Sequence, residues 1–565
     1  MRKRLIYLLL SCLSALLVTG CVEEINNTSQ GTETEVHFSL NIDDIHHTRA
    51  ISDGTSVDSL IYAIFTSEGE LVSRSGKPLP ETFASSLEMS MYVTLAQGCC
   101  YKAVFWAQSS KCDAYTLSDD MVLAVNYEGA NNDENRDAFY GVSTPFTLSD
   151  NSASVTLKRP FAQLNAGAYP FDWEYVTGFY NFDVTKSVAR VRDVADTLNL
   201  WDGSVYGSID ALFAPGAIPQ ESLYANVDED SRDEEYTYLS MSYILAGTEP
   251  TTHSVDFYFL DENNQAIMFD SPALEEVTLQ RNCHTDFVGQ VLSNEGELNP
   301  LEYVPATEDV EYNVSEPTTI ANKLYTMSGH NGLVFGSEDG QKVTMNNVYI
   351  TGDIWTIELG GYRGPNYVNY NNELNNVVLH NLSTTSAIEC HEWYFSPAVI
   401  AYGNTVVNNC TMTGATTVRE PITDKHGVAH EVIPVDFGVR NESDAVINGG
   451  RFGTVFAWTH AVVDIHGAKI DTLYCGTCDS TDHSWMTIHS GTTIDKVICC
   501  EPRCPYGKLE YSTTMTIKSG AVIGSLQLVS TDVEFLIIEP GAKVGKITCD
   551  GVEYSYDDLR AAMQS

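Results

Sequence analysis

The chain has 565 residues, and its formal net charge at pH 7 is −45 because 76 acidic side chains outnumber 31 basic ones. This charge argues against nucleic acid and anionic lipid as partners, since both are polyanions. Lys and Arg are scarce, whereas Gly, Asn and Thr are plentiful, a composition typical of an all-β protein. The length predicts two to four domains.

The N-terminus has the pattern of an export signal, with MRKR supplying positive charge ahead of the apolar run LIYLLLSCLSALLVTG. The run is short for a membrane span and leads into VTGC, whose last residue is Cys21. This pattern resembles the signal of a bacterial lipoprotein. The resemblance implies that residues 1–20 are removed and that lipid on Cys21 anchors the chain in the outer membrane, at the cell surface. The alternative is an ordinary secretory signal with a chance cysteine.

Short β-strands are expected through the first half of the chain. Residues 21–34 are polar and acidic, and they predict a flexible tether. Beyond them, EVHFSLNI at 35–42 alternates apolar and polar residues as a half-buried strand does, and YKAVFWAQ at 101–108 is another strand. Gly, Pro, Asn and Asp separate such strands, which favours β-sandwiches. A stretch rich in Pro, Glu and Thr at 297–320 predicts a linker to a different domain.

A tighter repeat follows this linker. In each copy an apolar strand reaches a glycine, then a small residue, then Ile or Val, and then a second short strand. The copies are VVDIHGAKIDTL, MTIHSGTTIDKV, MTIKSGAVIGSL and FLIIEPGAKVGKI, with glycines at 467, 491, 520 and 541. The repeat predicts a right-handed parallel β-helix-like solenoid over 321–550, in which glycine forms a corner and stacked coils share one core. Residues 551–565 predict a helical cap, and a second pair of sandwiches is the alternative fold.

Asparagines follow several strands in the earlier part of this region. We expect them at corners equivalent to those of the glycines, where stacked amide groups satisfy one another. The asparagines concerned are Asn347, Asn376, Asn409 and Asn448.

Five cysteines gather near the end of the repeat, Cys475 and Cys478 in CGTC and Cys499, Cys500 and Cys504 in CCEPRC. Two cysteine groups about 20 residues apart approach the spacing of a zinc knuckle. The groups also fall near equivalent places in successive coils, which favours disulfides or buried thiols. A redox pair in CGTC is the least supported hypothesis, since no βαβ pattern surrounds it. We expect a disulfide or, alternatively, a metal cluster here, and no cofactor.

The segment LQRNCHTDFVGQVL at 279–292 places a thiol, an imidazole and a carboxylate within four positions. A nucleophile must lie within hydrogen-bond reach of its base. In a continuous strand, however, Cys283 would point away from His284 and Asp286, because successive side chains alternate between faces. The segment is therefore interpreted as a strand, with Cys283 in the core and His284 and Asp286 on the outer face.

Three segments resemble the fimbrillin-like proteins, which are lipoprotein-derived subunits and accessory proteins of type V pili in Bacteroidota. They are HTRAISDGTSVDSLIYAIF at 47–65, VTLKRPFAQLNAG at 155–167 and LQRNCHTDFVGQVLS at 279–293. More narrowly, the chain is similar to an uncharacterised branch that adds other C-terminal modules. The resemblance implies two β-sandwich lobes, 35–165 and 166–296, without cofactor or catalysis.

The same resemblance implies a route of assembly. Subunits of that family are cut after an arginine near the N-terminus, which frees a groove for a strand from a neighbour. Arg49 before Ala50 is the matching position in this chain. The alternative is that Arg49 lies in a plain loop and is never cut.

These patterns predict a non-enzymatic surface lipoprotein that acts as an adhesin or as a pilus tip, anchor or accessory subunit. Its expected partners are the membrane, pilin subunits, and surface glycans or host proteins. The alternative is a β-helix that binds or degrades polysaccharide, for which several carboxylates and aromatic rings are available although no spacing selects a pair. These are Asp436, Asp444, Asp464, Asp471, Trp355, Tyr362, Tyr367, Tyr370, Trp393, Tyr394 and Trp458.

Overall fold

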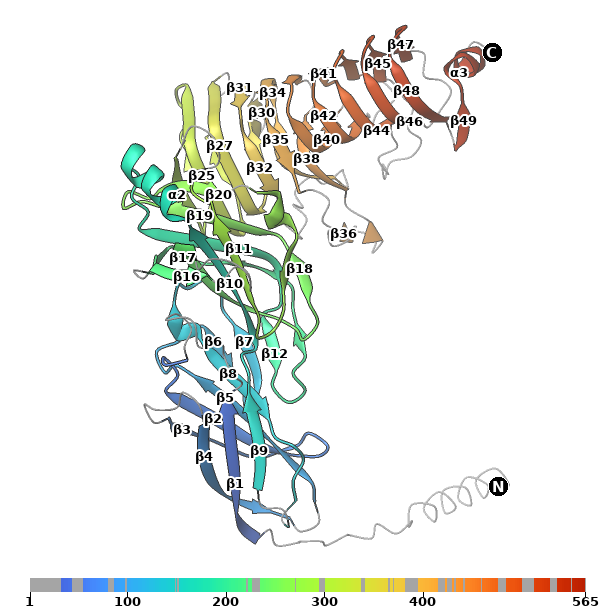
Figure 1. Cartoon of the computed structure of the whole chain (residues 1–565). Helices are drawn as coiled ribbons and strands as arrows, with labels where there is room; N and C mark the ends of the chain where they lie inside the picture. Colours follow the sequence, from blue (N-terminus) through green and yellow to red (C-terminus); the bar gives the residue numbers. More distant parts are fainter. Residues whose placement is uncertain are drawn as a thin grey trace, which may run out of the picture. The chain divides into compact units, whose positions relative to one another are not determined.

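The computed structural model of the chain is almost entirely β, which confirms the all-β class (Figure 1). The chain divides into two compact units, unit 1 with Met1–Glu262 and Met268–Leu298, and unit 2 with Asn263–Ile267 and Asn299–Ser565. The structure describes residues 32–42, 54–79, 86–96, 99–147, 149, 152–219, 222–225, 234–269, 271–293, 300–336, 341–363, 366–368, 370–381, 395–414, 422–423, 429–430, 433–440, 443–458, 460–475, 484–499, 513–528, 536–549 and 551–563. Among these residues, no helix is both long and apolar enough to cross a membrane.

The N-terminal part of unit 1 contains two sheets that share one apolar core. The first sheet has the order β4 (Ser86–Leu95), β1 (Thr32–Ile42) and β9 (Ser152–Leu157). The second has the order β3 (Leu71–Pro78), β2 (Ser59–Thr66), β5 (Tyr101–Gln108) and β8 (Ala138–Val142). Alternation puts every second side chain of β1 and β5 inside, so Phe38 and Phe105 meet in one buried cluster.

The second part of unit 1 is built around the long strand β10 (Phe161–Ala168), whose residues are all buried. Its sheet has the order β16 (Ser222–Ala225), β17 (Glu234–Leu245), β10 and β22 (His284–Gly289). Strand β11 (Lys186–Val194) pairs with β14 (Ile209–Leu212), β15 (Gly216–Ala217) and β19 (Val255–Leu260). Because β10 runs through 161–168, the predicted lobe boundary at 165/166 falls inside a strand.

Shorter elements complete unit 1. Two small sheets pair β6 (Tyr115–Leu117), β7 (Val122–Val125), β12 (Thr197–Asn199) and β13 (Val205–Tyr206), and β18 (Thr251–His253) with β21 (Val277–Leu279). The helical segments are η1 (Glu134–Arg136), α2 (Pro170–Glu174), the π-turn η2 (Tyr175–Phe179) and η3 (Pro272–Glu275).

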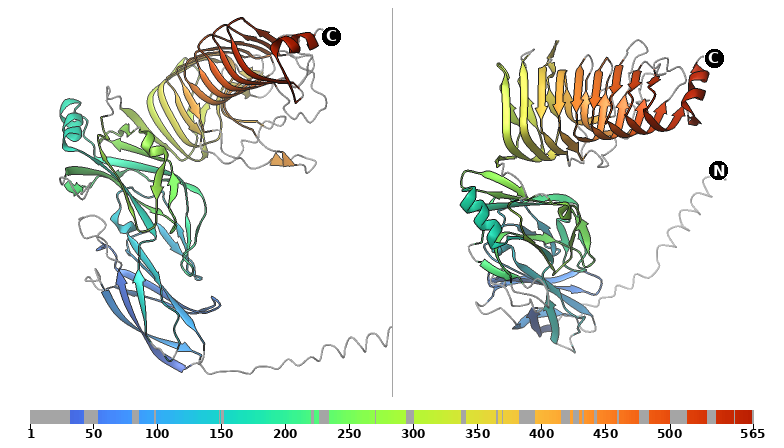
Figure 2. Two further views of the ribbon diagram at one scale, coloured as in Figure 1. Left: turned by 45° about the vertical axis from the view of Figure 1, so that its right-hand side comes forward. Right: turned by 45° about the horizontal axis from the view of Figure 1, so that its top comes forward.

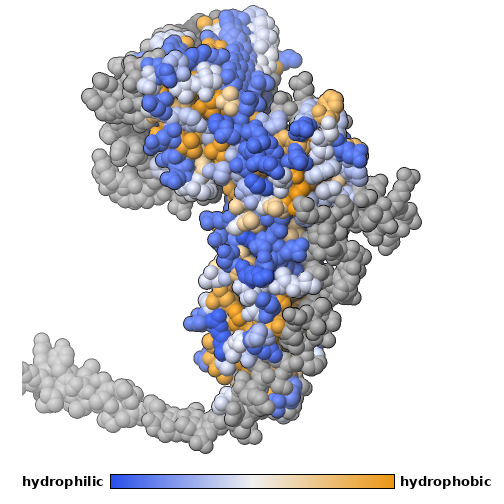
Figure 3. All heavy atoms as spheres, turned by 90° about the vertical axis from the view of Figure 1, so that its left-hand side faces the viewer, coloured by the Kyte–Doolittle hydropathy of each residue, from blue (hydrophilic) through white to orange (hydrophobic). Residues whose placement is uncertain are grey.

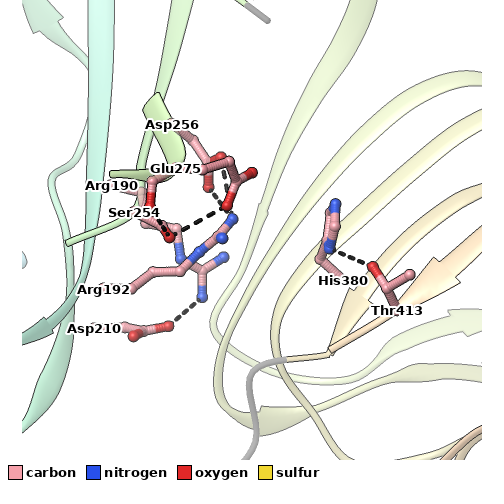
Figure 4. A network of polar contacts seen from close by, with 8 residues as sticks. All are labelled: Arg190, Arg192, Asp210, Ser254, Asp256, Glu275, His380 and Thr413. Atoms are coloured by element: carbon pink, nitrogen blue, oxygen red, sulfur yellow. Dashed lines mark hydrogen bonds and ion pairs between the residues drawn. The ribbon is translucent and has the colours of Figure 1, made fainter. Parts of the chain in front are cut away.

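Buried charges fix the parts of unit 1 together. Asp172 in α2 is fully buried and accepts hydrogen bonds from the Leu292 and Ser293 backbone N–H groups at 2.8 and 2.9 Å. Figure 4 shows a second group, in which Arg192 on β11 meets Asp256 at 2.8 Å and Arg190 meets Asp210 at 2.8 Å. Buried charges need such partners because desolvation is costly. These contacts connect α2 to the residues that follow β22, and β11 to its neighbours in the sheet.

Unit 2 consists of strands from successive turns of chain that pair in parallel, and we call it the coil stack (Figure 2). The first ladder contains β25 (Thr318–Asn331), β27 (Lys342–Ile354), β31 (Tyr370–Asn375), β34 (Gly403–Asn408), β39 (Asp444–Asn448), β41 (Val462–His466), β43 (Ser484–Ile488), β45 (Thr513–Ile517) and β47 (Leu536–Ile538). The second starts from the end of β27 and contains β32 (Val378–Asn381), β35 (Thr411–Thr413), β40 (Arg451–Ala457), β42 (Lys469–Cys475), β44 (Thr493–Cys499), β46 (Val522–Leu528) and β48 (Lys543–Cys549).

A third ladder, β28 (Ile357–Leu359), β33 (Phe395–Ala401) and β38 (Ile433–Val439), joins the end of β40. Inward side chains from all three ladders form one continuous core along the stack, for example Leu379, Ile447 and Phe437. Because each coil buries its apolar face only against its neighbours, stability depends on the stacking. Two hairpins, β29 (Gly361–Arg363) with β30 (Asn366–Val368) and β36 (Ile422–Thr423) with β37 (Ala429–His430), extend from the stack.

The corner after the first ladder shows how the sequence turns each coil. Asn322, Asn347, Asn376 and Asn409 have φ of 51–53°, and Gly449, Gly467, Gly491, Gly520 and Gly541 follow with φ of 66–95°. Asn and Gly are the residues that tolerate this left-handed conformation best. The amide groups stack, with Asn347 donating to Asn322 at 2.9 Å and Asn409 to Asn376 at 3.2 Å. Asn448, which the sequence predicts to lie at a corner, is instead the last residue of β39. Its side-chain amide donates to that of Asn408, the last residue of β34, at 2.9 Å.

The N-terminal end of unit 2 differs from the predicted boundary, whereas a helix lies within the predicted cap 551–565. The predicted linker 297–320 contains β23 (Leu301–Ala306) and β24 (Val310–Tyr312), and β23 pairs in parallel with β25, so it forms part of the first coil. Strand β24 pairs with β26 (Leu333–Phe335), and β20 (Gln265–Phe269) pairs with β23. At the other end, β49 (Val552–Tyr554) and α3 (Tyr556–Met563) follow β48, and Leu559 of α3 is buried in the core.

Candidate functional site

Strand β1 occupies the middle of its sheet. It pairs with β4 in antiparallel fashion from Thr32 to Asn41 and with β9 in parallel from His37 to Ile42. Its side chains at 36, 38 and 40 are fully buried, and the Phe38 ring lies 5.1 Å from that of Phe105. A strand held by two neighbours and by an apolar core is a fixed part of the fold, so its loss would open two strand edges and an apolar slot. We call this place the β1 slot.

The predicted lipidation site Cys21 and the predicted processing site, Arg49 and Ala50, lie outside the described residues. In chain order, however, Arg49 stands between β1, which ends at Ile42, and β2, which begins at Ser59. A cut after Arg49 would therefore separate β1 from the rest of the chain covalently.

The segment LQRNCHTDFVGQVL is not one continuous strand. Strand β21 ends at Leu279, Asn282 adopts a left-handed φ of 59°, and β22 begins at His284. Cys283 is exposed at this turn, so the expectation of a core cysteine is wrong. His284 and Asp286 are exposed as expected, and Asp286 accepts a hydrogen bond from the Asn165 amide at 2.7 Å. Pairing of β22 with β10 makes two of the fimbrillin-like segments direct neighbours.

The structure describes two of the five cysteines of the predicted cluster. Cys475 and Cys499 occupy the same position in successive coils and are both buried, and their Sγ atoms lie 3.4 Å apart. Cys478, Cys500 and Cys504 lie outside the described residues. Within the described part of the chain, no group of three or more His, Cys, Asp or Glu side chains could hold a metal ion. The visible pair has the arrangement of stacked thiols, and its oxidation state stays a prediction.

Cys410 is a second buried thiol in the coil stack, and it yields a pH prediction. Its Sγ donates to the Leu374 carbonyl and accepts from the Val377 N–H, and burial raises its pKa from the ordinary value of 9.0 to about 11. The folded state therefore binds this proton more tightly than the unfolded state. Its contribution to stability is complete below pH 9 and is lost as the pH rises through 11.

At pH 11 about half of the folded molecules and nearly all of the unfolded ones have lost this proton, so the loss of stability amounts to about 2 kcal/mol. Urea unfolding of unit 2 at pH 8 and pH 11 should therefore show a loss of stability that is about 2 kcal/mol smaller in Cys410→Ala than in the wild type. Identical losses in the two proteins would refute the assignment of this effect to Cys410.

The carboxylates considered for catalysis do not converge on one place. Asp436 is fully buried on β38 and accepts a hydrogen bond from the Thr454 N–H at 2.7 Å. Asp471 lies on the second ladder beside Arg451 at 3.6 Å, whereas Asp444 and Asp464 lie on the first ladder. Of the aromatic residues considered, Tyr370 and Trp458 are buried and Trp355 is half-buried, and the side chains at 362, 367, 393 and 394 lie outside the description.

The outer face of the first ladder is a regular array, which we call the coil-stack flank. It comprises the outward side chains of β31, β34, β39, β41, β43, β45 and β47 and the residue that follows each of the last three strands. Register places them in three columns, Asn371–Asn404–Asp444–Val462–Trp485–Thr514, Glu373–Val406–Val446–Asp464–Thr487–Thr516–Ile537 and Asn375–Asn408–Asn448–His466–His489–Lys518–Glu539.

Trp485 is the residue of the flank that sequence reasoning missed. Its side chain is 43% exposed, although the neighbouring Met486 and Ser484 are buried. The alternation in SWMTI, with Met486 and Ile488 inward, is the signal that predicts its outward direction. Figure 3 shows small groups of hydrophobic residues in orange among hydrophilic residues in blue on one face of the molecule.

Comparisons with known proteins concern the N-terminal part of the chain. A model described as a family of unknown function (DUF6562) matches residues 27–301. No curated protein matches the sequence. Three solved structures are similar to this chain: a fimbrial assembly protein from Parabacteroides distasonis, and the fimbrial anchor protein Mfa2 and the C-terminally truncated tip fimbrial protein Mfa3 from Porphyromonas gingivalis.

Their sequence identities to this chain are 12%, 12% and 11%, and their TM-scores are 0.24, 0.25 and 0.26. The matches cover 48%, 45% and 45% of this chain and 95%, 90% and 94% of the three proteins respectively. The family match ends at residue 301, where the first strand of the coil stack begins.

Proposed function

We propose that the chain is a non-enzymatic cell-surface lipoprotein that joins a pilus as an adhesin, tip, anchor or accessory subunit. In this proposal two sandwich lobes are followed by a right-handed parallel β-helix, and lipid on Cys21 attaches the chain to the outer membrane. The carrying observation is that β1, which pairs with a strand on each side, ends at Ile42 and so lies on the N-terminal side of Arg49 in the chain. The lipoprotein-like signal and the three fimbrillin-like segments support the same role.

The physical basis is strand addition. Loss of β1 would leave the facing edges of β4 and β9 unpaired and would uncover the apolar residues that pack on Phe38. A strand of a neighbouring subunit with alternating apolar residues would restore both the hydrogen bonds and the core. Burial of three apolar side chains contributes about 1.5 to 3 kcal/mol each, enough for stable subunit contacts.

A strand-uptake assay tests the proposal. A form that starts at residue 22 is folded and then cut at a specific protease site that replaces residues 45–49, and a labelled peptide of residues 30–44 is added. The cut form is expected to exchange its β1 for the peptide with a micromolar or lower Kd, whereas the uncut form does not. A peptide with Phe38→Asp is the matched control and should not bind, because it would bury a charge.

Two results would overturn the strand-addition role. One is a cut protein that stays folded, by hydrogen exchange of β5 and β10, yet takes up no peptide after β1 has been washed away. The other is equal uptake by the cut and uncut forms. Mass spectrometry of the native protein adds an independent readout. Processing after Arg49 predicts a mature chain that begins at Ala50 and has lost the lipid on Cys21, whereas an unprocessed, membrane-attached subunit keeps the residues before Ala50 and the lipid.

A further inference from the structure

The coil-stack flank has few unbalanced charges, although the whole chain has a net charge of −45. Lys342 meets Glu373 at 2.6 Å, Lys518 meets Glu539 at 2.7 Å, and Asp464 lies 3.5 Å from the His489 Nε2 atom. The hydrogen bonds from the two lysines lower the pKa of Glu373 and of Glu539, which keeps both pairs ionised. With histidine counted as neutral, as in the net charge of −45, Asp444 and Asp464 add two negative charges to the flank. The flank therefore suits an uncharged partner better than a polycation or a polyanion.

The remaining side chains of the flank offer two kinds of contact. Trp485 presents a partly exposed indole in the first column, where Thr514 is its register partner, and Thr487 and Thr516 lie in the adjacent column. An indole face packs against apolar C–H groups, and hydroxyl groups both donate and accept hydrogen bonds. Amide groups of Asn371 and Asn404 continue the first column, with Asn404 donating to Asn371 at 3.1 Å.

The array is also extended and repetitive. Neighbouring strands in a sheet lie about 4.8 Å apart, so the seven strands of the flank present similar positions at a constant spacing. A linear molecule with repeated units can contact several coils at once, and each weak contact then adds to the same affinity. Small molecules would gain less from such a flat surface, because it encloses little of their area.

From these features we infer that the coil-stack flank binds a neutral polysaccharide chain, with the C–H face of a sugar ring against Trp485 and sugar hydroxyls on the threonine and asparagine side chains. This inference rests on the proposed surface role and names its ligand class. It does not depend on strand exchange, because the flank belongs to unit 2 and β1 belongs to unit 1.

Affinity electrophoresis of the chain from residue 22 tests the inference, with mannan, galactomannan, xyloglucan or dextran in the gel and alginate as the acidic counterpart. At least one neutral polysaccharide is expected to retard the protein. Trp485→Ala should weaken that retardation by at least about fivefold, and Trp485→Phe should keep most of it. The matched control is Phe179→Ala, which removes a 72%-exposed ring from unit 1 and should change nothing.

Each other result counts against the inference. No retardation by any neutral polysaccharide, retardation by alginate alone, or equal retardation of wild type and Trp485→Ala would overturn it. Thr487→Val with Thr516→Val should also weaken binding while hydrogen exchange of β43 and β45 stays unchanged, which separates lost contacts from lost folding. Strand uptake should be normal in Trp485→Ala, so failure of this inference is distinguishable from failure of the pilus role.

Discussion

Asp137→Ala is expected to destabilise unit 1 by about 3 to 5 kcal/mol, because it removes the carboxylate that faces a buried guanidinium. Arg159 donates to Asp137 through Nε at 2.5 Å and through a terminal nitrogen at 2.6 Å. The two side chains are only 4% and 1% exposed. The Arg159 guanidinium also lies 4.9 Å from the centre of the Phe139 ring. A charge left in this position would keep its desolvation cost and lose its main compensation.

Urea unfolding followed by hydrogen exchange of peptides from β8 and β10 measures this effect in unit 1 separately from the coil stack. Asp119→Ala is the matched control, since Asp119 also meets an arginine, Arg74 at 2.6 Å, but is 97% exposed. We expect it to change stability by less than about 0.5 kcal/mol. The double variant Asp137→Leu with Arg159→Met should be more stable than Asp137→Ala alone. If Asp137→Ala behaved like the surface control, the pair would contribute no net stability.

This ion pair also explains part of the fimbrillin-like segment VTLKRPFAQLNAG. Arg159 lies two residues before β10, which begins at Phe161, and its guanidinium pairs with Asp137. The sequence alone identifies the segment as a strand, because FAQLNAGA has β character and lies between turn residues. It does not identify Asp137 as the partner, since the two residues are 22 positions apart and both lie outside the strands.

The alternation of apolar and polar residues, and the positions of glycine, predict those features of the fold that depend only on nearby residues in the chain. EVHFSLNI places residues 36, 38 and 40 inside, and the glycines of the repeat have the positive φ that a corner needs. Both features depend on the residue and on its immediate neighbours along the chain. The same rule, applied to SWMTI, would have placed Trp485 on the flank. What it cannot predict is the number of coils, because that depends on which separate segments pair.

The segment LQRNCHTDFVGQVL shows where alternation fails. Asn282 can adopt a left-handed φ without a large cost, so the chain turns there. The alternation of side chains between the two faces of the sheet therefore applies only from His284, where β22 begins. Cys283 is then exposed, and the conclusion that it forms no nucleophile–base pair with His284 rests on the turn and not on strand alternation. Similarly, residues 301–312 within the predicted linker form strands because the first coil supplies parallel partners, which overrides a weak local preference.

The corners of the coil stack give the second large expected effect. Gly450, which follows the corner residue Gly449, has φ of 87°, and a Cβ atom there would lie 2.1 Å from the Cys410 carbonyl oxygen of the preceding coil. Gly450→Ala should therefore destabilise unit 2 by about 2 to 5 kcal/mol, through a left-handed alanine and through displacement of a backbone carbonyl. Displacing that carbonyl also disturbs the hydrogen bond from the Arg451 N–H, which it accepts at 2.8 Å.

Gly467 supplies the matched control, because its φ is 66° and no atom lies within 4 Å of a Cβ built there. Gly467→Ala should destabilise unit 2 only by the cost of a left-handed alanine, about 1 kcal/mol. Gly467→Asn should destabilise it less, since asparagine occupies the equivalent corner in four earlier coils. Hydrogen exchange of β40 and β42 in increasing urea should show the smallest loss of stability in Gly467→Asn, a larger loss in Gly467→Ala and the largest loss in Gly450→Ala. Equal losses at the two positions would mean that the left-handed conformation dominates, whereas a larger loss at Gly450 shows that close stacking of successive coils limits which residues a corner accepts.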